Sequence, residues 1–327
     1  MHAQRLIADR PLPLLASTED APGADAEAAA AWAAAHRDEI EAHVTRAGVL
    51  LVRGFKIDTP AQFRAVCAAI RPDLQNYTGG DSPRDGVDEQ VYTSSEYPAH
   101  LEVLLHNELA YAGWSPDRVF FGCMIPSETG GETHIADGRE VCARIDPAVR
   151  ERFETRGVTY LQHLWDADGE PGIGKSWQET FETGDRATAE AYLRKSNMEF
   201  EWTGFGLRTA ATHAAILEHA VTGEKCWHNQ VDQWHRGMET VKVSFGGAED
   251  TRIDPATAGV ETLGNHATFA DGGEIAVDDL KHVRSVMRGC EVLFPWQAGD
   301  VMVIDNVLAM HGRKPFTGER RVLVAMA

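Results

Sequence analysis

The C-terminal stretch, residues 289–327, places the strongest constraint on the fold, because it alternates short apolar runs with glycine and aspartate turns. Each run has the length of a strand and is too short for a helix, so the stretch predicts three strands. Similar apolar runs predict further strands at 48–55, 91–97, 101–108, 118–125 and 158–165. These strands do not alternate regularly with helices. The sequence therefore predicts a mainly β fold with helical decoration, a jelly roll or barrel rather than a sheet of βαβ units.

Helices are predicted outside this β core. The signals are an alanine-rich stretch, a Thr-Pro helix start and runs of helix formers, at 25–47, 59–70, 145–157 and 185–197. The stretch 71–90 is rich in glycine, proline and aspartate, and we expect a lid or active-site loop there. The 327 residues contain no repeat or clear linker, which predicts one domain, 1–327, with a helical insertion within about 166–220.

Charge and cysteine usage exclude several classes of protein. The formal net charge of -19 argues against binding to nucleic acid or to anionic membranes. No apolar run is long enough to span a membrane, so we expect no membrane span, and the first residues lack a continuous apolar segment, so we expect no signal peptide. Its five cysteines are scattered and form no Cys-x-x-Cys pair, so we expect neither a disulfide framework nor a cysteine zinc site. A reducing, cytoplasmic compartment fits this usage.

His106 and Glu108 lie in a stretch that otherwise predicts a half-buried strand. Charged groups are costly to bury unless they are paired or bound to a metal. On a strand, residues two apart point to the same face. Two histidines and one carboxylate form a facial triad, which leaves open positions on Fe(II). The pair supplies two of these groups, and the third ligand must come from another strand.

The His-x-Asp/Glu pattern is weak alone, because it occurs at 36–38, 100–102 and 106–108. The first match lies in a predicted helix, where residues two apart do not face each other. The second and third matches share the parity of one strand. Periodicity therefore leaves the choice between them open.

The C-terminal stretch adds a histidine and two arginines. His311 follows an apolar strand and an Asp-Asn turn, and the last strand begins with Arg320 and Arg321. Arginine binds carboxylates in a fork, so this placement suits an anionic cosubstrate. An arginine pair at a rim, paired with acidic residues, explains the pattern equally well.

Five segments together resemble the Fe(II)- and 2-oxoglutarate-dependent oxygenases of the taurine dioxygenase (TauD/TfdA) family, and especially its SyrP-like amino-acid hydroxylases. These segments are 48–55, 91–111, 120–141, 222–230 and 294–327. The resemblance implies a double-stranded β-helix, a cupin-like jelly roll. It also implies Fe(II) as the metal, with 2-oxoglutarate and O2 as cosubstrates.

The resemblance implies that His106, Glu108 and His311 are the iron ligands, and this selects the third His-x-Glu match. Most relatives carry aspartate as the middle ligand, whereas Glu108 matches a smaller branch that carries glutamate. Related halogenases lack this carboxylate, so the retained Glu108 argues against halogenation.

The resemblance also places the cosubstrate. Thr133 and Arg321 match the positions that bind the carboxylates of 2-oxoglutarate, and Arg320 takes the place of Arg321 if the register shifts by one. Glu102 and Arg313 are candidate substrate contacts. Glu102 could pair with a cationic group and Arg313 with a carboxylate, although both could equally be structural salt bridges.

The implied function is hydroxylation of an unactivated C–H bond of an amino acid in natural-product biosynthesis. The amino acid is free or tethered to a peptidyl carrier protein. Desaturation or cyclisation by the same site is the first alternative. A non-catalytic metal-binding jelly roll and a zinc hydrolase are alternatives of other classes. The sequence predicts neither the substrate nor the oligomeric state.

Overall fold

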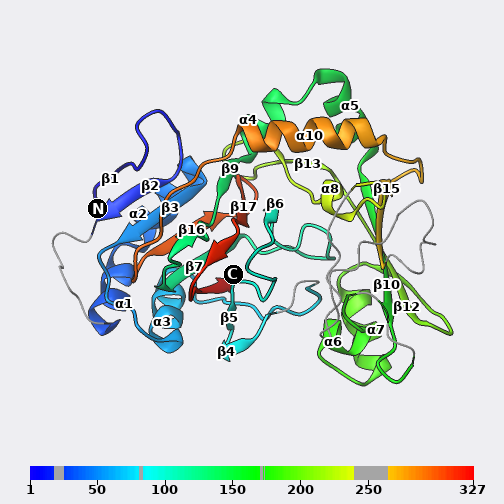
Figure 1. The fold of residues 1–327 in the computed structure, drawn as a ribbon, viewed down its shortest axis with the longest axis horizontal. Helices are drawn as coiled ribbons and strands as arrows, with labels where there is room; N and C mark the ends of the chain where they lie inside the picture. The colour runs from blue at the N-terminus through cyan, green and yellow to red at the C-terminus, as the bar shows by residue number, and fades with distance from the viewer. Residues whose placement is uncertain (18–25, 81–83, 170–171, 173, 239–263) are drawn as a thin grey trace.

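The structure, a computed structural model, describes the whole chain except residues 18–25, 81–83, 170–171, 173 and 239–263. One sheet, here called the large sheet, joins strands from both ends of the sequence (Figure 1). In order across the sheet they are β1 (Ala3–Arg5), β2 (Leu14–Ser17), β3 (Val49–Arg53), β16 (Val301–Asp305), β7 (Arg118–Ile125), β19 (Arg321–Met326), β5 (Val91–Thr93) and β4 (Gly86–Asp88). The C-terminal strands β16 and β19 lie on either side of β7.

A second sheet, the small sheet, consists of β6 (Val103–His106), β17 (Ala309–Arg313) and β9 (Ile135–Asp137) in that order. The central strand β17 pairs antiparallel with both neighbours. The short strands β8 (Thr129–Gly130) and β18 (Phe316–Thr317) pair beside it. The small sheet therefore brings the segment around residue 106 against the C-terminal segment around residue 311.

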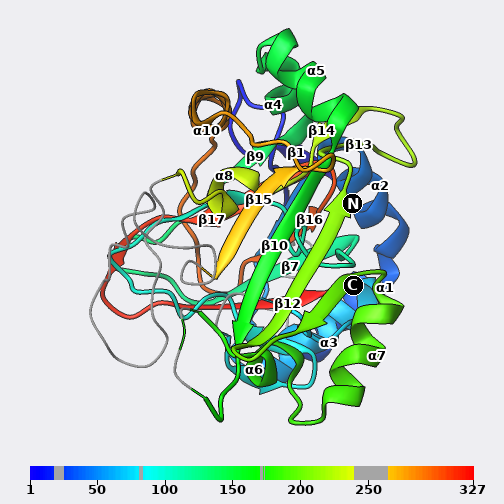
Figure 2. The same cartoon turned by 90° about the vertical axis from the view of Figure 1, so that its right-hand side faces the viewer.

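A third sheet lies on the right in Figure 1. Its order is β11 (Glu199–Trp202), β12 (Gly206–His213), β10 (Val158–Trp165) and β15 (Asn265–Phe269). Figure 2 shows the full length of its strands β10 and β12. All of its pairings are antiparallel. The hairpin of β13 (Ile216–Glu218) and β14 (Lys225–Trp227) lies between β12 and β15 in the chain.

The helices cover the outside of these sheets. The N-terminal helices α1 (Ala26–Ala35), α2 (Arg37–Ala47) and α3 (Pro60–Ile70) lie together on the left in Figure 1. The others are α4 (Gly138–Arg144), α5 (Pro147–Arg156), α6 (Trp177–Phe181), α7 (Arg186–Lys195), α8 (Val231–Trp234) and α10 (Val277–Gly289). None of the helices in the described parts of the chain is long and apolar enough to cross a bilayer.

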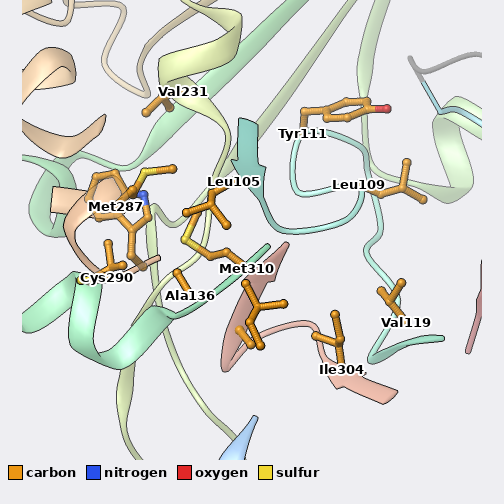
Figure 3. Packing of buried hydrophobic residues seen from close by; sticks show 14 of the residues in the cluster. Leu105, Leu109, Tyr111, Val119, Ala136, Val231, Met287, Cys290, Ile304 and Met310 are labelled. Carbon is orange, nitrogen blue, oxygen red and sulfur yellow. The ribbon is translucent and has the colours of Figure 1, made fainter. Parts of the chain in front are cut away.

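The large sheet is buried on both faces, which explains why its strands read as continuous apolar runs. In β3, Val49 and Leu51 join one core cluster, whereas Leu50 and Val52 join the cluster under the N-terminal helices. The first cluster continues into the small sheet, where Leu105 lies beside Met310 (Figure 3). This shared core fixes the position of the small sheet.

The predicted mainly β jelly roll with helical decoration is confirmed, and every predicted strand is present. The predicted helix 25–47 is divided at His36 into α1 and α2, and its residue 25 lies outside the described residues. The insertion predicted as helical within 166–220 contains α6 and α7 but also β11, β12 and β13. Its residues 170–171 and 173 are not described.

The predicted loop 71–90 contains the short strand β4, and its residues 81–83 lie outside the described part of the chain. Its role as a lid stays a prediction. The organisation as one domain is likewise a proposal.

Candidate active site

The small sheet brings two histidines together. His106 is the last residue of β6, and His311 lies directly opposite it on β17. Their ring centroids are 4.5 Å apart. Antiparallel pairing therefore juxtaposes two imidazoles that are far apart in the sequence.

Glu108 lies in the turn after β6 and not on the strand itself, because β6 ends at His106. This turn brings its carboxylate next to the two histidines. The prediction that strand alternation places Glu108 on the same face as His106 is therefore wrong, although Glu108 does lie beside the histidines. Its Oε2 atom lies 3.3 Å from Nε2 of His311. Asn306 holds the turn, since its side chain accepts from the N–H of Glu108 at 2.7 Å and donates to the Glu108 carbonyl at 3.0 Å.

The donor set fits a divalent metal. One ligand atom from each of His106, Glu108 and His311 lies within 4.8 Å of the other two. Nδ1 of His106 donates to the carbonyl of Leu104 at 2.8 Å, which leaves the Nε2 lone pair for a metal. Glu108 and His311 are buried and His106 is half-buried, so a bound ion would be largely shielded from water.

The protonation states also suit metal binding. Burial and, to a smaller extent, the nearby His311 lower the pKa of His106 to about 3, so the imidazole is neutral. Burial alone would raise the pKa of Glu108. The Arg84 guanidinium and the hydrogen bond from His311 outweigh it and hold the pKa below its usual range. A neutral imidazole and a carboxylate are two of the groups that a facial triad requires.

A second cluster, His235, His266 and Glu274, is less suited to a metal. Nδ1 of His235 accepts from the N–H of Gly237 at 3.1 Å, and Nδ1 of His266 accepts from the N–H of Arg236 at 3.3 Å. A neutral ring whose Nδ1 accepts carries its hydrogen on Nε2. The Nε2 atoms that face Glu274 therefore have no lone pair to offer.

A third cluster, Glu102, His134 and Glu291, already contains its cation. Lys314 Nζ lies 2.6 Å from Glu102 and 2.6 Å from Glu291. His134 uses both ring nitrogens, on Glu291 and on the carbonyl of Val103. Among the described clusters, the one at residues 106, 108 and 311 is thus the candidate metal centre.

Asn306 tests how the turn positions Glu108. We expect Asn306→Ala to weaken the binding of Mn(II) or Fe(II) about 10- to 100-fold, because residues that orient a ligand contribute that much to metal affinity. Calorimetric titration measures the change. Asn229→Ala is the matched control, since Asn229 is also buried but donates to the carbonyl of Ala215, outside the site. Equal effects of the two substitutions would contradict this role of Asn306.

A small cavity of about 30 Å³ lies beside the cluster. Its wall consists of Arg84, Ser94, Ser95, Val103, His106, Phe121, Thr133, His311, Gly312, Arg313 and Arg320. The structure thus brings the predicted residues His106, His311, Thr133 and Arg313 to one pocket. Arg321 and Glu102 are not in its wall.

Arg320, and not Arg321, reaches the pocket. Its guanidinium donates to the carbonyl of Gly131 at 2.8 Å, to Ser94 Oγ at 3.2 Å and to Thr133 Oγ1 at 3.4 Å. Burial lowers the pKa of Arg320 to about 10, so it is still charged at neutral pH.

The prediction for Arg321 is corrected by this placement, because Arg321 begins β19 with an exposed side chain. The register of β19 against β7 shifts between Arg321 and Val322. Arg320 has the parity of Val322 and Val324. Both valines belong to the core cluster that includes Phe121 of the pocket wall.

Thr133 lies deep in the pocket wall and is 2 % exposed. Its Oγ1 accepts from Nε1 of Trp296 at 3.1 Å as well as from Arg320. A hydroxyl and a guanidinium side by side could bind one carboxylate.

The two predicted substrate contacts have structural partners. Glu102 pairs with Lys314 and, at 3.7 Å, with Arg288, so it belongs to a salt-bridge network outside the pocket wall. Arg313 does line the pocket, but its two Nη atoms donate to the carbonyls of Tyr97, Pro98 and Leu101 at 2.7 to 2.8 Å. These contacts indicate that Arg313 anchors the segment before β6. The exposed His100 likewise lies away from the metal cluster.

Sequence reasoning missed Arg84. Its Nη2 donates to both carboxylate oxygens of Glu108, at 3.0 and 2.8 Å, and its guanidinium lies 4.2 Å from the centre of the Tyr77 ring. It comes from the loop 71–90, where no periodic pattern marks an inward side chain. A lone arginine beside proline and aspartate gave no signal for the site.

Comparison with known proteins places the whole chain among known oxygenases. The family model for taurine catabolism dioxygenase TauD, TfdA family, matches residues 8–326. The chain is 34% identical over 290 residues to dapdiamide synthesis protein DdaC of Enterobacter agglomerans, covering 88% of this chain and 84% of that protein. It is 32% identical over 285 residues to a clavaminate synthase-like protein of Arabidopsis thaliana, covering 85% and 81%.

A solved structure shares the fold. Asparagine oxygenase in complex with Fe(II), 2S,3S-3-hydroxyasparagine and succinate superimposes with a TM-score of 0.54, at 13% identity. The match covers 92% of this chain and 83% of that one. The jelly-roll architecture therefore agrees with the family match.

Proposed function

The chain belongs to the TauD/TfdA family of dioxygenases, and from this premise we propose that it hydroxylates an unactivated C–H bond of an amino acid. As a member of this family it is an Fe(II)- and 2-oxoglutarate-dependent dioxygenase that uses O2. Iron bound by a facial triad supplies open coordination positions for the cosubstrates and the oxidising power for the reaction.

We propose that His106, Glu108 and His311 hold the iron. The single observation that carries this proposal is the meeting of their three ligand atoms, within 4.8 Å of one another, at the wall of a pocket. The small sheet positions the histidines, and the Asn306 turn positions the carboxylate. These three residues would hold the ion beside the pocket, where the cosubstrates could reach it.

Arg320 and Thr133 are proposed to bind the carboxylate of 2-oxoglutarate that lies away from the metal. Arg320 brings a half-buried positive charge, and Thr133 brings a hydroxyl next to it. The carbonyl of Gly131 and Ser94 Oγ fix the guanidinium in place. A preformed site of this kind orients the cosubstrate at low entropic cost.

The amino-acid substrate and the biosynthetic role draw support from the relative DdaC, which is named for dapdiamide synthesis. Whether the amino acid is free or attached to a peptidyl carrier protein is part of the proposal. A cytoplasmic location is also proposed, because all five cysteines are free and buried.

Mass detection of products tests the proposed reaction. The protein is incubated with Fe(II), 2-oxoglutarate, O2 and a panel of free L-amino acids. We expect succinate together with an equal amount of a product heavier by one oxygen atom. A product lighter by two hydrogens than the substrate would show that the reaction is desaturation or cyclisation and not hydroxylation. Protein that holds Fe(II) but releases no succinate would contradict the enzymatic proposal itself.

A further inference from the structure

We propose that Arg84 binds a free carboxylate of the substrate, so that the pocket selects substrates with an ionised carboxyl group over amides and thioesters. The inference rests on the proposed function and specifies the substrate of the same site. It begins from unpaired hydrogen-bond donors in the pocket wall.

The side chain of Arg84 is 4% exposed, and it lines the cavity beside the metal ligands. One nitrogen, Nη2, is used by Glu108. Its buried Nε and Nη1 atoms have no hydrogen-bond partner among the described residues. Buried N–H groups without a partner are rare and costly, and charged ones most of all. A ligand that accepts from Arg84 would remove this cost.

The charge in the pocket points to an anionic ligand. The part of the wall that the structure describes has no carboxylate but three arginines, Arg84, Arg313 and Arg320. Glu108 pairs with Arg84. Glu96 acts electrostatically on Arg313 and Glu132 on Arg320, both from outside the wall. The wall itself therefore carries an excess of positive charge. An uncompensated charge in a buried site raises the free energy of the folded protein. A carboxylate on the substrate reduces this excess, whereas a neutral or cationic group at the same place would not.

Arg84 is the arginine with most capacity left for such a ligand. Both Nη atoms of Arg313 donate to backbone carbonyls. Arg320 donates to Gly131, Ser94 and Thr133, and its remaining N–H groups lie at the end of the pocket already assigned to 2-oxoglutarate. Arg84 keeps two nitrogens available and is held over the Tyr77 ring. Its contact with Glu108 places the substrate carboxylate close to the metal.

This placement distinguishes free amino acids from carrier-bound ones that have no side-chain carboxylate. An aminoacyl thioester uses its α-carboxyl group for the tether and has no charge there. A free amino acid, or one with a side-chain carboxylate, retains the group that Arg84 recognises. The structure therefore favours a substrate that presents an ionised carboxyl to the site.

The test measures binding without turnover. Protein is loaded with Mn(II) and N-oxalylglycine, and free L-amino acids and their α-carboxamides are titrated into it. We expect the wild type to bind at least one acid about 30-fold or more tightly than its amide, the range of a charge-assisted hydrogen bond. In Arg84→Gln this preference falls to within about threefold. Arg84→Lys keeps the charge, retains part of the preference and controls for misfolding.

Arg186→Gln is the matched control. Arg186 also stacks on an aromatic ring, 4.4 Å from the centre of Trp202, and pairs with a carboxylate, Asp166, but it lies outside the pocket. We expect it to keep the full preference for acids.

Three outcomes would overturn the role of Arg84. They are an Arg84→Gln protein that keeps the preference, a wild type that binds no acid better than its amide, and an Arg84→Gln protein that no longer binds N-oxalylglycine. The last result would mean that Arg84 only supports Glu108. Failure of the proposed function is separate, because the wild type itself would then not bind Mn(II) and N-oxalylglycine.

Discussion

Succinate production falls at least about 1,000-fold when His311 is replaced by alanine, because the metal loses one of its three protein ligands. His311 Nε2 and Glu108 Oε2 are 3.3 Å apart, and the opposite ring of His106 completes the set. Alanine leaves two donors, too few to hold Fe(II) at working concentrations. The conversion of 2-oxoglutarate and the bound iron are measured on the same preparation.

His266→Ala is the control for this substitution. His266 is a buried histidine of the second cluster, whose Nδ1 accepts a backbone N–H. We expect it to retain iron and succinate production, with thermal melting used to confirm folding of both variants. If His266→Ala lost the iron while His311→Ala kept it, the assignment of the metal centre would be wrong.

The second large effect concerns the two neighbouring arginines. Arg320→Gln is expected to raise the KM for 2-oxoglutarate about 30- to 1,000-fold, which corresponds to the loss of about 2–4 kcal/mol of charge-assisted hydrogen bonding. Arg320 is half-buried beside the buried Thr133, where solvent only partly replaces its charge. Steady-state kinetics with varied 2-oxoglutarate give the value.

Arg321→Gln serves as the internal control, since this side chain is exposed at the start of β19. Its KM for 2-oxoglutarate is expected to stay within about twofold of the wild type, as for most exposed substitutions. If the KM for 2-oxoglutarate rose in Arg321→Gln but not in Arg320→Gln, the placement of Arg320 in the pocket would be wrong. The sequence-based assignment to Arg321 would then be correct.

These two arginines illustrate what a sequence pattern can and cannot predict. The apolar strand after them was evident, because Val322 and Val324 belong to one core cluster and Leu323 to the other. Arg320 has the parity of these two valines, whose cluster includes Phe121 of the pocket wall, so strand alternation alone favours Arg320. The assignment to Arg321 came from matching the family resemblance.

The metal ligands were predicted for a partly incorrect physical reason. Strand alternation was expected to place Glu108 beside His106, but β6 ends at His106 and the Asn306 side chain shapes the turn that follows. Asn306 is distant in sequence, so only the folded chain reveals this contact. Pattern alone also left residues 100–102 open, and the resemblance to a family made the choice.

Polar residues proved hardest to assign. Glu102 shares strand parity with His106, yet Lys314 and Arg288 pair with it outside the pocket. Arg84 lies in an irregular loop but reaches the centre of the site. Apolar periodicity predicts which face of an element is buried, whereas the partner of a charged side chain depends on tertiary contacts.

Crystals grown anaerobically with Fe(II) and 2-oxoglutarate test the central claim most directly, by anomalous diffraction at the iron absorption edge. The account predicts an iron peak bonded to His106, Glu108 and His311, with one 2-oxoglutarate carboxylate on Arg320 and Thr133. An iron peak at His235, His266 and Glu274, or a cosubstrate bound by Arg321 at the surface, would contradict it.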